Sequence, residues 1–116
     1  MGFKVPAHFL LGQTQALQKG HVMNLSEGGA LLMLKKSVQL GPNVALRFHI
    51  PPDQTVCEAS GHIVRIDDMG LYQGIGITLP RANPAYTIFL RNLAVADQNK
   101  VSYFVRDMGR IKVWIW

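Results

Sequence analysis

Apolar residues that recur at every second position, in short runs, constrain this chain more than any other feature of its sequence. The clearest run covers residues 43–50, where four large apolar side chains alternate with smaller or polar ones. A period of two predicts a β-strand that buries one face and exposes the other. Residues 71–79 repeat the pattern, with Gly74 and Gly76 on the face opposite the apolar side chains. The chain is therefore expected to be mainly β, as a barrel or a sandwich.

Turn-forming residues divide the chain into six such runs. Gly, Pro, Asn and Asp separate strands because they favour turns over the extended ladder. One helix is predicted at residues 84–96, since Asn83 can cap it and Pro84 suits its first turn. An added C-terminal β-hairpin is predicted at residues 101–116, with its turn at residues 107–109. The predicted strands are residues 5–11, 16–25, 30–35, 43–50, 55–67 and 71–79.

The composition predicts one domain over residues 1–116, with the barrel at about 4–80. Hydrophobic residues make up 48% of the chain and charged residues 16%, so there is enough apolar side chain to bury a core. Because Cys57 is the only cysteine, no internal disulfide can form, and a cytoplasmic location is expected. No apolar run has the length of a membrane span, so no membrane insertion is expected.

The charged and chemically reactive residues favour binding over catalysis. A net charge of +5 fits either an anionic partner or a merely soluble basic surface. The four histidines are not spaced as metal ligands, and Ser26 and Cys57 lack the neighbours of a nucleophile, so no metal, no other cofactor and no enzyme activity are expected. A turn explains the paired carboxylates Asp67 and Asp68 better than acid–base catalysis does. Single-stranded nucleic acid is not an expected partner, because the aromatic residues are scattered rather than interleaved with basic ones.

The segment from Asn24 to Gly29 (Asn-Leu-Ser-Glu-Gly-Gly) is the strongest candidate for a binding loop. The amide of Asn24 can address the hydrogen-bonding edge of a base, and the hydroxyl of Ser26 can bond a phosphate or the loop backbone. Gly28 and Gly29 allow positive φ and close approach of a ligand. The same pattern also forms an ordinary Asx-turn with no ligand, and the residues alone leave both interpretations open.

This loop resembles the second motif of the PilZ family, which reads Asp or Asn, any residue, Ser, two residues, Gly. Asn24, Ser26 and Gly29 match it in place, and the resemblance extends over about residues 4–96. It implies a six-stranded antiparallel barrel with one helix after the sixth strand. It also implies a regulatory module whose ligand is cyclic di-GMP. The supporting segments are Lys4-Val5-Pro6, Leu40-Gly41-Pro42-Asn43-Val44 and Gly74-Ile75-Gly76-Ile77.

The chain departs from the family pattern ahead of the first strand. PilZ receptors carry Arg-x-x-x-Arg there, and the resemblance assigns these guanidinium groups to guanine recognition. Lys4 stands at the second arginine position, and the first falls before Met1. Lysine offers a point charge without a planar fork, so Lys4 is expected to attract phosphates but to recognise guanine poorly. Either the arginines lie upstream, or the affinity for cyclic di-GMP is weak or lost.

Two further features leave alternatives open. Arg65, close to the end of the fifth predicted strand, either projects towards a bound anion or faces water. Trp114 and Trp116 share one face of the last strand, and such a face is seldom exposed. The favoured interpretation is that they close the core of the barrel. The alternative is that they dock on a second copy of the chain or on a protein partner of a motility, secretion or polysaccharide export system.

Overall fold

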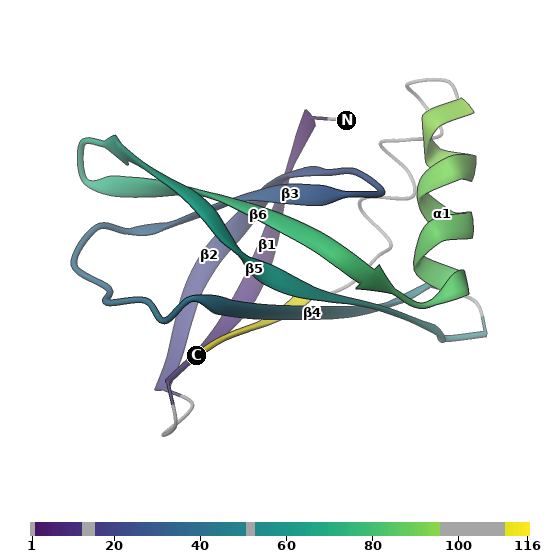
Figure 1. Cartoon of the computed structure of the whole chain (residues 1–116), viewed down its shortest axis with the longest axis horizontal. Coiled ribbons are helices and arrows are strands. Elements are labelled where there is room, and N and C mark those ends of the chain that lie inside the picture. The colour runs from purple at the N-terminus through teal and green to yellow at the C-terminus, as the bar shows by residue number, and fades with distance from the viewer. Residues whose placement is uncertain (1, 13–15, 51–52, 96–110) are drawn as a thin grey trace.

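The computed structural model describes residues 2–12, 16–50, 53–95 and 111–116 (Figure 1). It confirms a mainly β chain with one helix. The helix α1, Pro84–Val95, and the ends of the strands lie within a few residues of their predicted positions. The strands are β1 Gly2–Leu11, β2 Ala16–Leu25, β3 Gly29–Lys35, β4 Asn43–Ile50, β5 Thr55–Met69, β6 Tyr72–Ala82 and β7 Ile111–Ile115.

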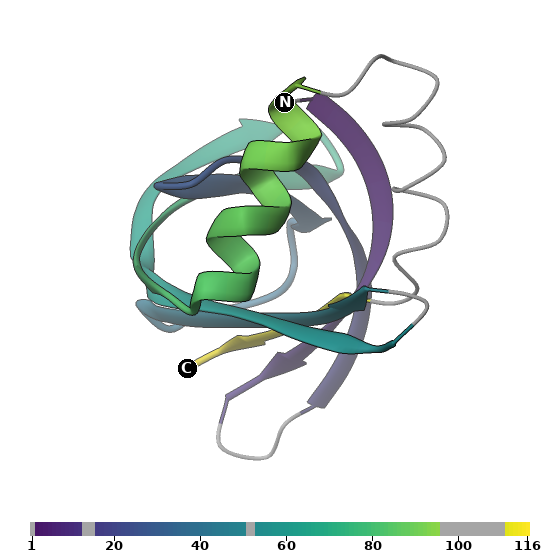
Figure 2. The ribbon, with the colours of Figure 1, turned by 90° about the vertical axis from the view of Figure 1, so that its right-hand side faces the viewer.

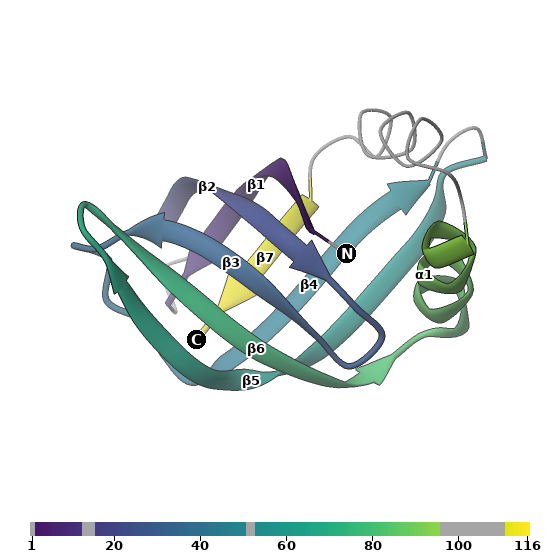
Figure 3. The same ribbon diagram turned by 90° about the horizontal axis from the view of Figure 1, so that it is seen from above.

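The strands form a closed barrel in the order β1-β2-β3-β6-β5-β4-β7. The prediction of six strands is wrong in this detail, because β7 is a seventh strand between β1 and β4 (Figure 3). It pairs parallel to β1 and antiparallel to β4, whereas the other neighbours are antiparallel. Both of its edges are thus occupied, so β7 is a barrel strand rather than one arm of a hairpin. The predicted first arm and turn, residues 101–109, lie outside the described residues.

The core lies inside the barrel, and β7 contributes one side chain in two to it. Ile111, Val113 and Ile115 are fully buried, whereas Trp114 is half-buried and Trp116 is 51% exposed on the outer face. The expectation that both tryptophans close the core is therefore wrong. Both faces of this strand carry large apolar residues, so the period of two could not decide which face points inward.

Helix α1 lies across one end of the barrel (Figure 2). Asn83 caps it as predicted, because its Oδ1 accepts a hydrogen bond from the Tyr86 amide at 3.0 Å. The same side chain also bonds β5, where Oδ1 accepts from the Glu58 amide and Nδ2 donates to the Val56 carbonyl. Phe48 of β4 packs against the rings of Tyr86 and Phe89 at 6.0 and 5.4 Å between centroids. In the part of the chain that the structure describes, no helix is long and apolar enough to span a membrane.

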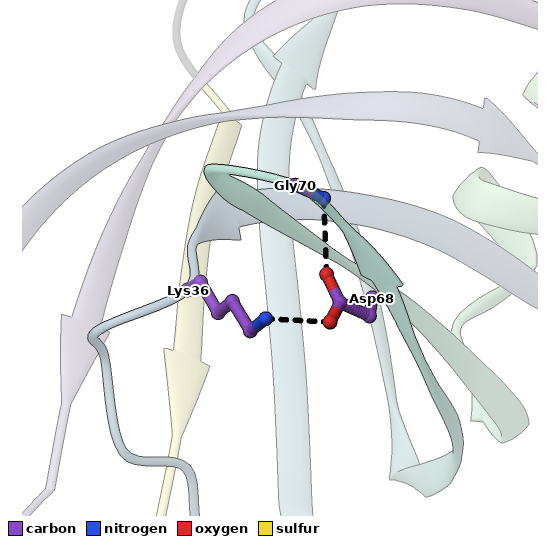
Figure 4. A network of polar contacts seen from close by, with 3 residues as sticks. All are labelled: Lys36, Asp68 and Gly70. Atoms are coloured by element: carbon purple, nitrogen blue, oxygen red, sulfur yellow. Dashed lines mark hydrogen bonds and ion pairs between the residues drawn. The ribbon is translucent and has the colours of Figure 1, made fainter.

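At the other end, an ion pair ties the β3–β4 connection to the β5–β6 hairpin (Figure 4). Lys36 Nζ lies 2.5 Å from Asp68 Oδ2, and the Gly70 amide donates to Asp68 Oδ1 at 3.0 Å. The Lys36 hydrogen bond, followed by that of Gly70, lowers the pKa of the Asp68 carboxyl. Asp68 thus serves a turn, in agreement with the prediction. β5 runs to Met69, two residues beyond its predicted end.

The placement of β7 predicts unequal costs for its last two side chains. Ile115→Ala is expected to lower the free energy of unfolding by about 2–5 kcal/mol, because it leaves a cavity in the core. Trp116→Ala removes a larger but half-exposed side chain and is expected to cost less than half as much. Urea denaturation followed by circular dichroism measures both values. Equal costs, or a larger one at Trp116, contradict the inward placement of Ile115.

Candidate functional site

The loop between β2 and β3 is closed by its own backbone. The carbonyl of Gly29 accepts hydrogen bonds from the Ser26 amide at 2.8 Å and from Ser26 Oγ at 3.1 Å. The Ser26 hydroxyl therefore bonds the loop, which is one of the two roles that the sequence left open. Its oxygen keeps lone pairs that can accept a further hydrogen bond. The loop is a shaped turn rather than a loose connection.

Helix α1 and strand β6 fix this loop from the side. Tyr86 donates its hydroxyl to the Ser26 carbonyl at 3.1 Å, and Arg91 Nε lies 2.7 Å from Glu27 Oε1. Burial, with a smaller effect of the nearby Cys57, raises the pKa of Tyr86, so its hydroxyl stays a donor. The Leu79 amide of β6 donates to the Gly28 carbonyl at 2.8 Å. Sequence reasoning placed none of these partners at the loop, because helical spacing does not show which loop of the barrel a helix contacts.

Gly28 and Gly29 have different roles. A Cβ on Gly29 would collide with the backbone carbonyl of Ile77 on β6, whereas a Cβ on Gly28 would meet no atom within 4 Å. Neither glycine has positive φ. Gly29 therefore closely approaches the backbone of its hydrogen-bonded neighbour β6, and this contact, rather than a ligand, is the close approach that the structure shows. Gly28 borders open space and is the glycine that a ligand can approach.

Asn24 and Arg65 lie in one row across the outer face of the barrel, which we call the Asn24–Arg65 row. Asn24 of β2 opposes Leu31 of β3, Leu31 opposes Gly76 of β6, and Gly76 opposes Arg65 of β5. Directly opposed residues share a face of the sheet. This face is the outer one, since Leu32 and the other alternating residues of β3 and β6 are buried. Three strand spacings separate the ends of the row, on the order of 14 Å.

The row depends on two irregularities in strand register. A shift between Val22 and Asn24 makes Met23 an extra residue in β2, and a shift between Ile63 and Arg65 does the same in β5. Without them, strict alternation would turn Asn24 and Arg65 towards the core, because Val22 and Ile63 face inward. Leu31 and Gly76 were not predicted as site residues, and only the register reveals them.

The charged candidates differ in their surroundings. Arg65 lies beside Gly76 and pairs with Asp67 at 2.8 Å, with both side chains largely exposed. Lys4 is exposed on β1, next to the register shift that places Gly2 opposite Asn24. Burial, and then the charge of Lys4, lowers the pKa of His21 on β2. The structure thus gathers Lys4, Asn24 and the loop at one side of the barrel, and places Arg65 three strand spacings from Asn24.

The other chemically reactive groups are the possible metal ligands and the single cysteine. Among the described residues, no group of three or more His, Cys, Asp or Glu side chains is placed to hold a metal ion. Cys57 is fully buried in the core, and burial raises the pKa of its thiol to about 11. The thiol therefore stays protonated and inert at neutral pH.

Tyr86→Phe tests the attachment of the loop to α1. Removing the hydroxyl leaves the Ser26 carbonyl without this donor, which is expected to cost about 0.5–1.5 kcal/mol of stability and to speed amide exchange at Ser26. Tyr72→Phe, at an exposed tyrosine of β6, is the matched control and should change stability by less than about 0.5 kcal/mol. Chemical denaturation and hydrogen exchange measured by NMR report both effects. Equal effects of the two substitutions would show that the bond does not hold the loop.

Comparison with known proteins gives a family match that covers both the barrel strands β1 to β6 and the β2–β3 loop. The family model described as PilZ domain matches residues 1–93, which include six of the seven strands and most of α1. No curated protein and no solved structure gives a significant match. The family match contains the complete Asn24–Arg65 row and the loop that follows Asn24. This chain belongs to the PilZ domain family.

Proposed function

We propose that the chain is a regulatory module that binds cyclic di-GMP along the Asn24–Arg65 row. PilZ domains form a non-catalytic family of ligand-binding and adaptor modules, with cyclic di-GMP as the ligand of the family. The observation that carries the proposal is the row itself, in which an amide and a guanidinium flank Leu31 and Gly76 on the outer face. A flat base can lie over Leu31 and Gly76 because Gly76 has no side chain to obstruct it.

The chemistry of each residue fits one part of such a ligand. The amide of Asn24 offers a donor and an acceptor to the edge of guanine, and the fork of Arg65 suits a phosphate or the guanine edge. Arg65 is paired with Asp67, but an exposed pair of this kind is worth only about 0.2–1 kcal/mol, so a ligand can replace it at small cost. Lys4 adds positive charge for the phosphates without a fork for the base. The affinity of this chain for cyclic di-GMP is therefore expected to be weak.

The attachment of the loop offers a way to report binding. Tyr86 of α1 is hydrogen-bonded to Ser26, and Arg91 of α1 forms an ion pair with Glu27. A ligand that moves the loop therefore also changes the surroundings of the helix. A protein partner of a motility, secretion or polysaccharide export system would read this change. Ordering of an arginine-bearing arm ahead of β1 would add to it, because the arm would change charge and shape at the same end of the barrel.

A second candidate function is a protein-interaction module that keeps the barrel without the nucleotide. The β5–β6 hairpin favours it, because it concentrates exposed apolar side chains, among them Leu71 at 84% exposure. Single exposed apolar side chains are ordinary on a protein surface, so this candidate rests on the number of them within one hairpin. The apolar residues of this hairpin are Val64, Ile66, Met69, Leu71 and Tyr72.

Titration calorimetry with cyclic di-GMP separates these functions. This chain is expected to bind cyclic di-GMP with a dissociation constant above about 1 μM, and an Arg-x-x-x-Arg arm joined ahead of Val5 should tighten binding at least about tenfold. In the arm-bearing chain, Arg65→Ala should weaken binding at least about tenfold, through loss of charge-assisted hydrogen bonds. Lys19→Ala removes an equal charge from an exposed position further along β2 and should change affinity less than about twofold.

Asn24→Ala is the second variant to be tested. It should remove most of the affinity in the arm-bearing chain while the thermal midpoint falls by only a few degrees, about 1 kcal/mol or less. A large loss of stability with little loss of binding would assign Asn24 to the fold of the loop. No binding with or without the arm would favour the interaction module. An unchanged affinity in Arg65→Ala would remove the row from the site.

A further inference from the structure

A groove on the outer face of the barrel lies away from the β2–β3 loop. It has a volume of about 420 Å³ and runs over β4, β5 and β7 to the junction of β6 and α1. This volume falls within the range of small-molecule sites, which is roughly 300–1,000 Å³. Its lining residues are Ala45, Leu46, Arg47, Glu58, Ala59, Ser60, Arg81, Ala82, Asn83 and Trp114.

The register of the strands explains why this surface is hollow. Trp114 of β7 opposes Ala45 of β4, Ala45 opposes Ser60 of β5, and Ser60 opposes Arg81 of β6. The two small residues form a floor between an indole on one side and a guanidinium on the other. Arg81 reaches this face because of a register shift in β6, in which two residues, Leu79 and Pro80, lie opposite Gly61. A bulge of this kind re-aims the side chain that follows it.

The walls of the groove combine a flat surface with a free positive charge. The guanidinium of Arg47 lies 5.7 Å from the ring centre of Trp114 and is held by Glu58 at 2.7 Å. Arg47 and Trp114 together present a guanidinium and an aromatic ring on which a flat group can stack. Arg81 is exposed and, among the described residues, has no carboxylate partner. Because Arg81 lines the groove, its positive charge is available to an anion that binds there.

We propose that this groove is a second ligand site that takes a nucleoside monophosphate. The base stacks on the Arg47–Trp114 pair, the sugar lies over Ala45 and Ser60, and the phosphate bonds the guanidinium of Arg81. Bases stack readily on aromatic and guanidinium planes, and arginine binds phosphate through two parallel hydrogen bonds. The site shares none of the residues assigned above to cyclic di-GMP, so neither proposal depends on the other.

Two-dimensional ¹H–¹⁵N NMR of the whole chain tests the site, with GMP and AMP as probes. The indole N–H resonance of Trp114, identified by its absence in Trp114→Phe, is expected to shift saturably with a dissociation constant at or below about 1 mM. Guanosine and inorganic phosphate should each bind at least about tenfold more weakly than GMP, because each lacks half of the contacts. The spectrum of each variant also shows whether it is folded.

The variants locate the binding. Arg81→Ala should weaken GMP binding at least about tenfold, whereas Lys19→Ala, the charge-matched control on β2, should weaken it less than about twofold. Asn24→Ala should leave the Trp114 shift unchanged, which separates this groove from the β2–β3 loop. The proposal is overturned by the absence of a saturable shift up to about 10 mM, by equal effects of Arg81→Ala and Lys19→Ala, or by phosphate binding as tightly as GMP.

Discussion

Closure of the barrel by β7 is the constraint on which the rest of the structure depends. Without this strand, β1 and β4 would each present a row of unpaired amide and carbonyl groups. The closing strand also delivers Ile111, Val113 and Ile115 to the core. Its end is fixed further, because Trp116 and Asn43 exchange two backbone hydrogen bonds of 2.9 and 3.0 Å. A strand far from β1 in sequence thus sets the position of every outward-facing residue on β1, β7 and β4.

A filled barrel leaves only its outer surface for the binding that we propose. The interior is occupied by apolar side chains such as Phe9, Phe48 and Leu32, so a ligand has no room within it. Helix α1 covers one end, and its Tyr86 joins the core and the β2–β3 loop in a single side chain. Rigidity at the loop therefore comes from the core. A loop fixed in this way loses little conformational entropy when it binds a ligand.

Much of the fold was predictable because it follows from local patterns. Alternation in residues 43–50 and 71–79 identified strands, and Asn83 with Pro84 identified the start of the helix. The role of β7 was not predictable, because its outer face also carries two large apolar side chains and its partners lie far away in the chain. The family motif indicated Asn24, Ser26 and Gly29 as a group. It gave no sign of Leu31 and Gly76, which reach the same row only through pairing with β2 and β5.

The outward direction of the key polar side chains rests on interruptions of the pattern that predicts the strands. Asn24, Arg65 and Arg81 each follow a register shift, and in each case uninterrupted alternation would have turned the side chain towards the core. In both outer rows, small residues then separate the polar or aromatic ends: Gly76 in one, Ala45 with Ser60 in the other. Small outward residues leave space above the sheet, and the register shifts place charged or amide groups beside that space. A regular seven-stranded barrel with the same core would turn these polar groups inward, so both binding proposals rest on the irregular pairs rather than on the fold alone.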